Sequence, residues 1–359
     1  MINILIFGAS GDISRKKVIP GLYEWYREIK ESNQLNVIGY GRTEMSDEKF
    51  RERIINNEFV KDEFVLNKDE AEFTNCFTYI TGQYNSEEGF IKIYNKLKTY
   101  AIDGPLIVYF GVPSKLSKEI IVNMLKCKIS SQYDCKYLIE KPIGNNLEDA
   151  QILLNKLDFL VGYDKIFILD HYLGKSSIQD INLSKNKNVK ELKIYLDEKE
   201  TADHRLEYFD NVGIFKDMVQ SHVLTLISHF CPELLININL NDIKIQNYEI
   251  GQYNGYKGSP KTETFIFLEI KWKEIYIKIH LGKKLEFDRK QIIYKYTTSE
   301  SSNVDIITLK SRNSEYKVLF QDALINDKTK FLSSKNIIDF WNISDYIWNK
   351  IKNKKFIKY

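Results

Sequence analysis

The first 170 residues alternate between short apolar runs and stretches with helical spacing of apolar side chains. The apolar runs predict buried strands at residues 2–6, 37–40, 105–110, 137–139 and 166–169. Residues 18–29, 46–55, 85–100 and 147–160 have the apolar periodicity of helices that cover a sheet. Strands that alternate with helices favour a parallel, doubly wound sheet. We therefore expect an α/β Rossmann-type N-terminal domain over residues 1–170.

The second half of the chain follows a different pattern. Residues 189–197, 264–270 and 275–281 alternate between apolar and polar side chains, which predicts strands of an antiparallel sheet with one solvated face. Residues 212–230 are apolar nearly all round and predict one long buried helix. Residues 316–347 predict a last helix. We expect an α+β C-terminal domain over residues 171–359 with a large, mainly antiparallel sheet.

Composition narrows the class of protein. The 359 residues include 43% hydrophobic and 28% charged side chains, as in soluble globular proteins, and exceed the usual size of one core. The 52 basic and 49 acidic residues leave a net charge of +3, so neither nucleic acid nor a membrane is an expected partner. The N-terminus has no signal-peptide pattern. The four cysteines form no C-x-x-C pair and no zinc spacing, which favours reduced thiols, a cytoplasmic protein and no metal.

A glycine-rich turn follows the first predicted strand. Gly8, Ser10, Gly11 and Asp12 form a G-x-x-G-D motif, a shorter form of the G-x-G-x-x-G fingerprint, and a helix follows. Small residues at this place let the backbone approach a pyrophosphate at a helix N-terminus. Strand, glycine turn and helix are nevertheless common in α/β proteins, so the motif alone is a weak indication of nucleotide binding.

Two basic residues lie at the ends of other predicted strands. Arg42 stands where NAD-binding folds place an acid, and an arginine there favours the 2′-phosphate of NADP. Glu44 is close to it, and a solvated loop charge is an equally good interpretation of Arg42. Lys141 lies between Glu140 and Pro142, where it is either a ligand contact or an exposed lysine in a turn.

A polar cluster follows the strand at 166–169. Asp170, His171, Tyr172 and Lys175 bring a carboxylate, an imidazole, a phenol and an ammonium to one strand end. Ligands of open α/β sheets bind at such ends. The alternative is an ordinary polar strand end with a turn glycine.

The predicted buried helix carries polar residues that need partners. His222 shares a helix face with Met218 and Leu226, and Asp217 lies elsewhere on the same helix. His222 is either a hydrogen-bonded core histidine or a general base in a largely dry environment.

Together these motifs resemble the glucose-6-phosphate dehydrogenase family over nearly the whole chain. The matching stretches appear in the family's order. They are residues 8–12 with 15–17 and Pro20, residues 39–42, 140–144 and 170–175, then 208–210, Gly213, 217–222, 261–265 and 282–283. The last part of the chain, with residues 320–324 and Trp341, is also similar. The sequence Asp-His-Tyr-Leu-Gly-Lys at 170–175 is highly specific to the family, whereas the glycine turn is not.

The resemblance implies NADP-dependent oxidation of β-D-glucose 6-phosphate at C1, with NAD as a possible cofactor. It implies that His222 takes the proton of the C1 hydroxyl and that Asp170 orients the imidazole. It implies that the sugar phosphate is held by His171, Tyr172, Lys175, Glu198, Asp217 and Lys283, the assignment of Glu198 competing with Asp197 and Glu200. On the cofactor side it implies Gly8, Ser10, Gly11, Asp12, Arg15, Arg42, Tyr109 and Lys141. It also implies a homodimer formed through the C-terminal sheet.

Several departures from the family pattern leave alternatives open. The chain is shorter than typical members, the segment between Lys175 and Tyr208 is cut down, and Ser221 replaces the usual asparagine before the base. The same chemistry on an amino- or deoxysugar phosphate is one alternative. A non-catalytic nucleotide-binding homologue is a second alternative. Such a homologue would have no need to retain Asp170, Lys175 and His222 together, which argues against it.

Overall fold

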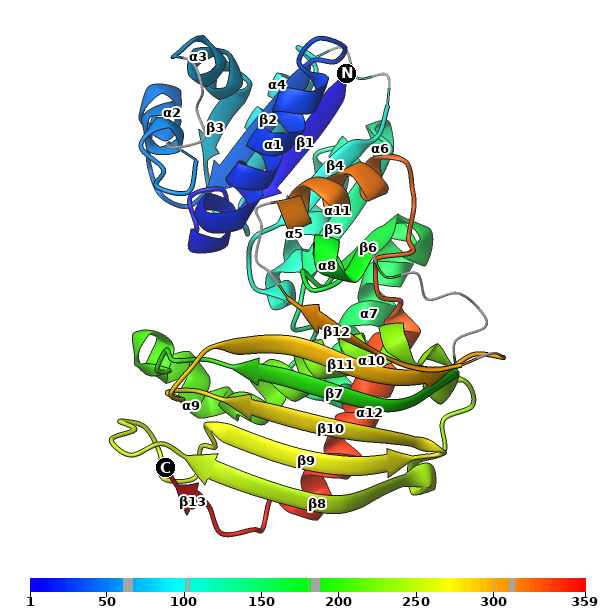
Figure 1. Ribbon diagram of the computed structural model, residues 1–359. Coiled ribbons are helices and arrows are strands. Elements are labelled where there is room, and N and C mark those ends of the chain that lie inside the picture. Colours follow the sequence, from blue (N-terminus) through cyan, green and yellow to red (C-terminus); the bar gives the residue numbers. More distant parts are fainter. Residues whose placement is uncertain are drawn as a thin grey trace. The chain divides into compact units, whose positions relative to one another are not determined.

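The computed structural model describes residues 1–60, 67–100, 102, 104–179, 181, 188–299, 301–309 and 314–359 (Figure 1). The chain divides into two compact units, each with its own sheet. The first unit comprises Met1–Gly174 and Arg312–Ser334, and the second comprises Lys175–Ser311 and Lys335–Tyr359.

The first unit contains a six-stranded sheet in the order β3-β2-β1-β4-β5-β6. Its strands are β1 (Ile2–Phe7), β2 (Leu35–Gly41), β3 (Phe77–Thr81), β4 (Leu106–Phe110), β5 (Cys135–Glu140) and β6 (Ile166–Leu169). Every neighbouring pair is parallel, and the strand order reverses between β1 and β4. The predicted Rossmann-type fold is therefore confirmed, and its switch point lies where β1 and β4 end.

Helices cover both faces of this sheet, which explains why its strands are apolar on both sides. They are η1 (Ser14–Val18), α1 (Ile19–Ile29), α2 (Asp47–Ile55), α3 (Asn67–Asn75), α4 (Glu87–Leu97), η3 (Ser114–Leu116), α5 (Ser117–Lys126), α6 (Ile129–Gln132), α7 (Leu147–Val161), η4 (Tyr163–Lys165) and α11 (Ser314–Leu324). Phe7 of β1 packs on Phe90 of α4, with ring centroids 5.7 Å apart. On the other face Ile4 shares a core with Trp25 of α1 and Phe320 of α11.

The predicted last helix is in fact two helices. Helix α11 ends at Leu324, and α12 (Ser334–Ile351) begins ten residues later, with all of its residues after Ser334 in the second unit. Asn326, with φ of 61°, adopts the left-handed conformation that often ends a helix. Tyr316, Leu319 and Phe320 of α11 are buried in the core of the first unit beside α1 (Figure 1). The sequence-based boundary after residue 170 had assigned this helix to the second domain.

The second unit contains a seven-stranded sheet in the order β12-β11-β7-β10-β9-β8-β13. Its strands are β7 (Asn188–Asp197), β8 (Ile243–Gln252), β9 (Phe265–Trp272), β10 (Ile275–Gly282), β11 (Arg289–Thr297), β12 (Ser302–Thr308) and β13 (Ile357–Lys358). Two neighbouring pairs, β7–β10 and β8–β13, are parallel and the others antiparallel, so the prediction of a mainly antiparallel sheet is confirmed. Alternation holds within strands: Ile277 and Ile279 are buried, whereas Tyr276 is exposed.

The helices of the second unit include the segment predicted as one buried helix. They are α8 (Ser176–Gln179), η5 (Asp203–Arg205), α9 (Leu206–Ile214), η6 (Phe215–Val223), α10 (Leu224–Phe230), η7 (Pro232–Leu235), η8 (Leu240–Asp242) and α12. The chain turns at Gly213, whose φ is 69° and where a Cβ atom would lie 2.3 Å from Glu263 Oε1. The Glu263 carboxylate accepts the backbone N–H of Phe215 at 2.9 Å, so it satisfies a donor at the start of the new helical segment.

No helix in the described part of the chain is both long enough and apolar enough to cross a membrane.

Candidate functional site

The glycine turn lies at the carboxyl end of β1, beside the end of β4. Gly8 has a φ of 81°, and a Cβ atom there would lie 2.3 Å from the carbonyl oxygen of Gly111. The N–H of Gly11 donates to the carbonyl of Gly8 at 2.9 Å, and the N–H of Arg15 donates to the carbonyl of Gly11 at 3.1 Å. The turn is therefore compact and leads directly into a helix, as an anion-binding turn requires.

Hydroxyl and guanidinium groups gather near the end of β2. Ser10 Oγ lies 3.2 Å from Thr43 Oγ1, and Arg53 of α2 donates to the carbonyl of Ser10 at 3.4 Å. The exposed Arg42 places its guanidinium carbon 5.9 Å from the ring centre of Tyr84. Sequence reasoning singled out Ser10 and Arg42 but missed Thr43 and Arg53. Arg53 gave no signal, because an arginine on the polar face of a helix is ordinary.

Asp12 and Arg15 bind each other at the start of the helix that follows the turn. Arg15 Nη2 lies 3.1 Å from Asp12 Oδ1 and Arg15 Nη1 lies 2.7 Å from Glu58 Oε1. Lys16 Nζ lies 2.6 Å from the other oxygen of Asp12. Hydrogen bonds from Lys16 and Arg15 lower the pKa of Asp12, so its carboxylate stays charged within a basic surrounding.

Tyr109 lies in the core of the first unit. Its side chain is fully buried and its ring centroid lies 6.0 Å from that of Tyr316 and 5.7 Å from that of Phe320. Its hydroxyl donates to Glu140 Oε1 at 2.9 Å. This position does not support the predicted cofactor contact through the phenol.

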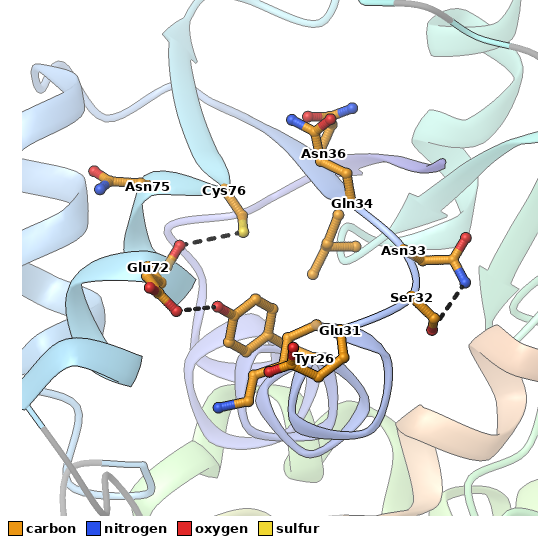
Figure 2. Close-up of a pocket in the computed structure, with 11 residues that line it drawn as sticks. Tyr26, Glu31, Ser32, Asn33, Gln34, Asn36, Glu72, Asn75 and Cys76 are labelled. Carbon is orange, nitrogen blue, oxygen red and sulfur yellow. Dashed lines mark hydrogen bonds between the residues drawn. The ribbon is translucent and has the colours of Figure 1, made fainter.

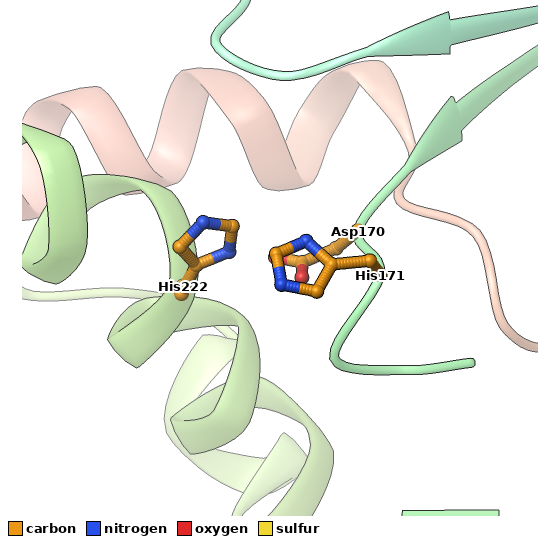
Figure 3. A group of neighbouring side chains, drawn as sticks. All are labelled: Asp170, His171 and His222. Carbon is orange, nitrogen blue, oxygen red and sulfur yellow. The ribbon is translucent and has the colours of Figure 1, made fainter. Parts of the chain in front are cut away.

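The ends of β5 and β6 bring together two predicted residues from separate motifs. Lys141 Nζ donates to Asp170 Oδ2 at 2.9 Å, and the two side chains are only 4% and 0% exposed. Asp170 Oδ1 accepts the backbone N–H of Tyr172 at 3.0 Å. Burial lowers the pKa of Lys141, and the neighbouring carboxylate of Asp170 opposes that effect. Figure 3 shows Asp170 and His171 where the chain leaves β6.

A second carboxyl group lies next to this pair. Glu140 Oε1 accepts the hydroxyl of Tyr316 at 2.7 Å as well as that of Tyr109. Burial raises the pKa of Glu140 to about 7, although both hydrogen bonds act in the opposite direction. Tyr316 comes from α11, far along the sequence, and the sequence carried no sign of its role.

The turn at 170–174 has clear local causes. The N–H of Leu173 donates to the carbonyl of Asp170 at 3.0 Å, and the rings of His171 and Tyr172 are 4.7 Å apart. A Cβ atom at Gly174 would lie 2.8 Å from the carbonyl oxygen of Glu315, so α11 leaves no room for a side chain there. Lys175 begins the second unit and is 6% exposed.

Within the second unit, Asp217 and His222 come from the same helical segment, η6. Asp217 is 8% exposed and accepts Arg205 at 3.0 Å and the hydroxyl of Tyr208 at 3.3 Å. Burial, with the carboxylate of Asp217 beside it, raises the pKa of Tyr208 to about 12. His222 is partly exposed and projects from its helix, as Figure 3 shows.

Glu198 and Lys283 meet at the ends of the parallel strands β7 and β10. The N–H of Glu198 donates to the carbonyl of Gly282 at 2.9 Å, and the Glu198 carboxylate binds Lys283 directly and Lys290 at 3.1 Å. Burial opposes ionisation of Glu198, but the two lysines outweigh it and hold its pKa below the usual value.

The neighbouring Asp197 has a different environment. Its fully buried carboxylate lies 2.6 Å from His280 Nδ1 and 2.9 Å from Arg289 on the adjacent strands. Sequence reasoning left Asp197 as a competitor of Glu198. Its ion pairs with neighbouring strands favour a structural role for Asp197 and leave Glu198 as the better candidate.

A polar cavity of about 500 Å³ lies at the opposite end of the first sheet (Figure 2). It is lined by the end of α1 and the start of β2, and the hydroxyl of Tyr26 donates there to Glu72 at 3.3 Å. Burial raises the pKa of the Cys76 thiol to about 11, so it is not a reactive thiolate. The cavity is at the amino ends of the strands, away from the edge where ligands of such sheets bind.

Comparison with known proteins identifies the family. A model described as glucose-6-phosphate dehydrogenase, NAD binding domain, matches residues 5–180, and one described as glucose-6-phosphate dehydrogenase, C-terminal domain, matches residues 181–252. The glucose-6-phosphate 1-dehydrogenase of Cyberlindnera jadinii is 27% identical over 340 residues, covering 81% of this chain and 68% of the relative. That of Borreliella burgdorferi is 29% identical over 362 residues, covering 84% and 74%.

A solved structure agrees with the fold. A glucose-6-phosphate dehydrogenase in complex with its substrate glucose-6-phosphate matches with a TM-score of 0.83 at 21% identity, covering 100% of this chain and 94% of the other. The fold and the matched domains define an oxidoreductase with a nicotinamide-cofactor domain. The chain belongs to the glucose-6-phosphate dehydrogenase family.

Proposed function

We propose that this protein oxidises glucose 6-phosphate at C1 to 6-phosphoglucono-δ-lactone with NADP as the hydride acceptor. The observation that carries the proposal is the buried Lys141–Asp170 pair at the carboxyl edge of the parallel sheet. A buried ion pair of this kind costs desolvation energy, so a core built for stability alone has little need of it. It joins Lys141, which the family resemblance assigns to the cofactor, to Asp170, which the resemblance assigns to the reaction.

The residues at the first sheet fit a dinucleotide. Gly8 packs so closely on Gly111 that the turn stays compact, and such a turn before a helix suits a pyrophosphate at the helix N-terminus. Gly11 closes the same turn, and Arg15 offers a cation one turn into the helix. Arg42 and Arg53, with the hydroxyls of Ser10 and Thr43, suit a 2′-phosphate and so support NADP over NAD.

In the proposed reaction, a side chain of this protein accepts one proton and neighbouring charged side chains stabilise the resulting charge. His222 accepts the proton of the C1 hydroxyl through a ring nitrogen, and Asp170 stabilises the imidazolium that forms. The buried Lys141 ammonium keeps Asp170 ionised, since an opposite charge at 2.9 Å favours the carboxylate. A bound nicotinamide ring supplies the acceptor for the hydride from C1.

The sugar phosphate is held by charged and polar side chains. Lys175 and His171 offer positive charge to the phosphate, and Tyr172 adds a hydroxyl. Asp217 and Glu198 accept sugar hydroxyls. Lys283 offers a further cation beside Glu198.

The experiment is a steady-state assay of nicotinamide reduction by the purified chain. It compares kcat/KM for glucose 6-phosphate with values for glucosamine 6-phosphate, 2-deoxyglucose 6-phosphate and unphosphorylated glucose, each with NADP and NAD. The proposal predicts the highest kcat/KM for glucose 6-phosphate with NADP. A higher value for an amino- or deoxysugar phosphate overturns the choice of sugar, and cofactor binding without turnover of any sugar overturns the enzymatic proposal.

We further propose a cytoplasmic homodimer formed through the sheet of the second unit. The side chains of Tyr276, Val304 and Ile306 are 54%, 58% and 64% exposed on its strands and offer apolar surface that a second copy could bury. Sedimentation analysis of the wild type and of Ile306→Glu tests it. A monomeric wild type contradicts the proposal.

A further inference from the structure

Glu140 is the last residue of β5 and directly precedes Lys141. Its Oε1 atom accepts two phenolic hydroxyls, from Tyr109 on β4 at 2.9 Å and from Tyr316 on α11 at 2.7 Å. Both tyrosines are buried, at 0% and 2% exposed. Two hydroxyl groups with no access to water are thus directed at one carboxylate oxygen, which fixes the position of Glu140.

The charged groups around Glu140 are those proposed for the reaction. Lys141 follows it in the chain, and Asp170 at the end of β6 binds Lys141 at 2.9 Å. The electrostatic influence of Glu140 favours the charged ammonium of Lys141, which burial disfavours. On α11 the charged residues next to Tyr316 are Glu315, which lies 4.0 Å from Lys17 of η1, and Lys317, which pairs with Glu28 at 2.6 Å. Among the described residues, the groups that act on the pKa of Glu140 include these two tyrosines, the Lys141 ammonium and the Asp170 carboxylate, and the ion pairs of Glu315 and Lys317 lie on the same helix as Tyr316.

We propose that Glu140, held by Tyr109 and Tyr316, is a positioning residue that controls the charge of Lys141 and thereby the Lys141–Asp170 pair. The inference rests on the proposed roles of Lys141 and Asp170. In its ionised form Glu140 shares the task of keeping Lys141 protonated, and in its protonated form that support is withdrawn. Burial brings the pKa of Glu140 to about 7, so this change falls in the neutral range. Helix α11 then contributes to the reaction centre through Tyr316 rather than only to the core.

A purely structural role makes a different prediction. Because Oε1 accepts both hydroxyls, the amide oxygen of Glu140→Gln can accept them too, so this substitution removes charge while keeping the hydrogen bonds. If Glu140 only anchors the strand end, the variant behaves like the wild type at every pH, or is impaired equally at all pH values. If its charge acts through Lys141, the difference depends on pH.

The experiment measures kcat/KM and the dissociation constant for NADPH in the full chain between pH about 6 and pH about 8. Glu140→Gln should match the wild type near the acidic end, where the wild-type residue is protonated as well. At the alkaline end both cofactor affinity and kcat/KM should fall by about tenfold. This is the effect of an interaction that shifts a pKa by about one unit. Tyr316→Phe and Tyr109→Phe remove donors that lower the pKa of Glu140, so their profiles should shift to higher pH.

Tyr26→Phe is the matched control. It also removes a tyrosine hydroxyl from a glutamate, but at the opposite end of the sheet (Figure 2), and its profile should match the wild type. A ratio of wild type to Glu140→Gln that is constant with pH overturns the inference while leaving the proposed function intact. A pH-dependent ratio of NADPH affinities without sugar turnover supports the inference and removes the proposed reaction. A wild type that binds no NADPH at either pH overturns both.

Discussion

Lys141 donates a hydrogen bond to Asp170 at 2.9 Å between two side chains that are almost completely buried. The peptide bond between Lys141 and Pro142 is cis, and the carboxylate is held from its other side by the N–H of Tyr172. Two parallel strands, β5 and β6, end side by side and so deliver the pair to the edge where ligands bind. The pair links the proposed cofactor site to the proposed reaction centre within one unit.

Removing one partner of this pair should be costly. Lys141→Ala leaves the Asp170 charge buried without its main counter-ion, so we expect the free energy of unfolding to fall by about 3–5 kcal/mol. Lys92→Ala is the control, because Lys92 pairs with Glu88 at 2.7 Å on an exposed helix surface and should lose about 0–1 kcal/mol. Urea unfolding of both variants measures the two losses in the free energy of unfolding. Equal losses would show that burial does not make the Lys141–Asp170 pair more costly to break.

His222 should govern the chemical step. His222→Asn is expected to lower kcat by roughly 10²–10⁴-fold, the usual contribution of a general base, while sugar-phosphate binding is largely kept. His204→Asn, an exposed histidine of the same unit, should leave kcat unchanged. Steady-state kinetics with a binding titration separate the two effects. Wild-type kcat in His222→Asn would remove this residue from the mechanism.

Arg42 should set the preference for the cofactor. Arg42→Ala is expected to raise KM for NADP by about 10- to 150-fold with little change for NAD, because a charge-assisted contact to a phosphate contributes roughly 1.5–3 kcal/mol. Arg27→Ala removes another arginine that lies 5.9 Å from a tyrosine ring, that of Tyr23, and should affect neither cofactor. Equal loss for NADP and NAD would mean that Arg42 does not contact the 2′-phosphate.

Gly8 should tolerate no side chain. A Cβ atom would lie 2.3 Å from Gly111 oxygen in a backbone conformation with φ of 81°, so Gly8→Ala must shift the turn and weaken cofactor binding strongly. At Gly104 nothing lies within 4 Å of an added Cβ, and Gly104→Ala should bind NADPH like the wild type. Fluorescence titration with NADPH compares them. Normal affinity of Gly8→Ala would contradict a role of this turn in cofactor binding.

Stability should decline as pH rises through neutrality, in part because of Glu263. Burial raises the pKa of this carboxyl from the usual 4.5 to about 7 in the folded chain. The folded state therefore binds its proton more tightly, and the stability gained is complete below pH 4.5 and lost as pH rises through about 7.

Glu263→Gln should remove that part of the slope. The free energy of unfolding of this variant should decline less than that of the wild type between pH about 5 and pH about 8. Glu286→Gln, at an exposed position, should retain the wild-type slope. Urea unfolding at both pH values measures it, and an unchanged slope in Glu263→Gln would show that Glu263 ionises normally in the folded chain.

The sequence predicted the parts of the fold that have a strong local pattern. Strands β1, β2, β4, β5 and β6 are rich in apolar residues because helices bury both faces of their sheet. Strand β3 was missed, since Phe77–Thr81 is short, lies at the sheet edge and alternates with threonines. The break at Gly213 was also missed, because its cause, the carboxylate of Glu263, lies far along the chain.

The candidate site was predictable only where chemistry coincides with a strand end. Lys141 and Asp170 were both singled out, since each follows an apolar run, but their ion pair depends on the adjacency of β5 and β6. The contribution of Tyr316 could not be foreseen, because α11 returns to the first unit after the whole second sheet. For Tyr109 the family resemblance predicted a cofactor contact, but its phenol lies in the core of the first unit.

The most direct test of the proposed reaction follows the hydrogen at C1. Purified protein is mixed with NADP and glucose 6-phosphate that carries deuterium at C1, and the reduced cofactor is analysed by mass spectrometry. Oxidation at C1 with direct hydride transfer predicts that the NADPH formed contains a single deuterium. NADPH without deuterium, or no NADPH at all, would contradict the proposed reaction.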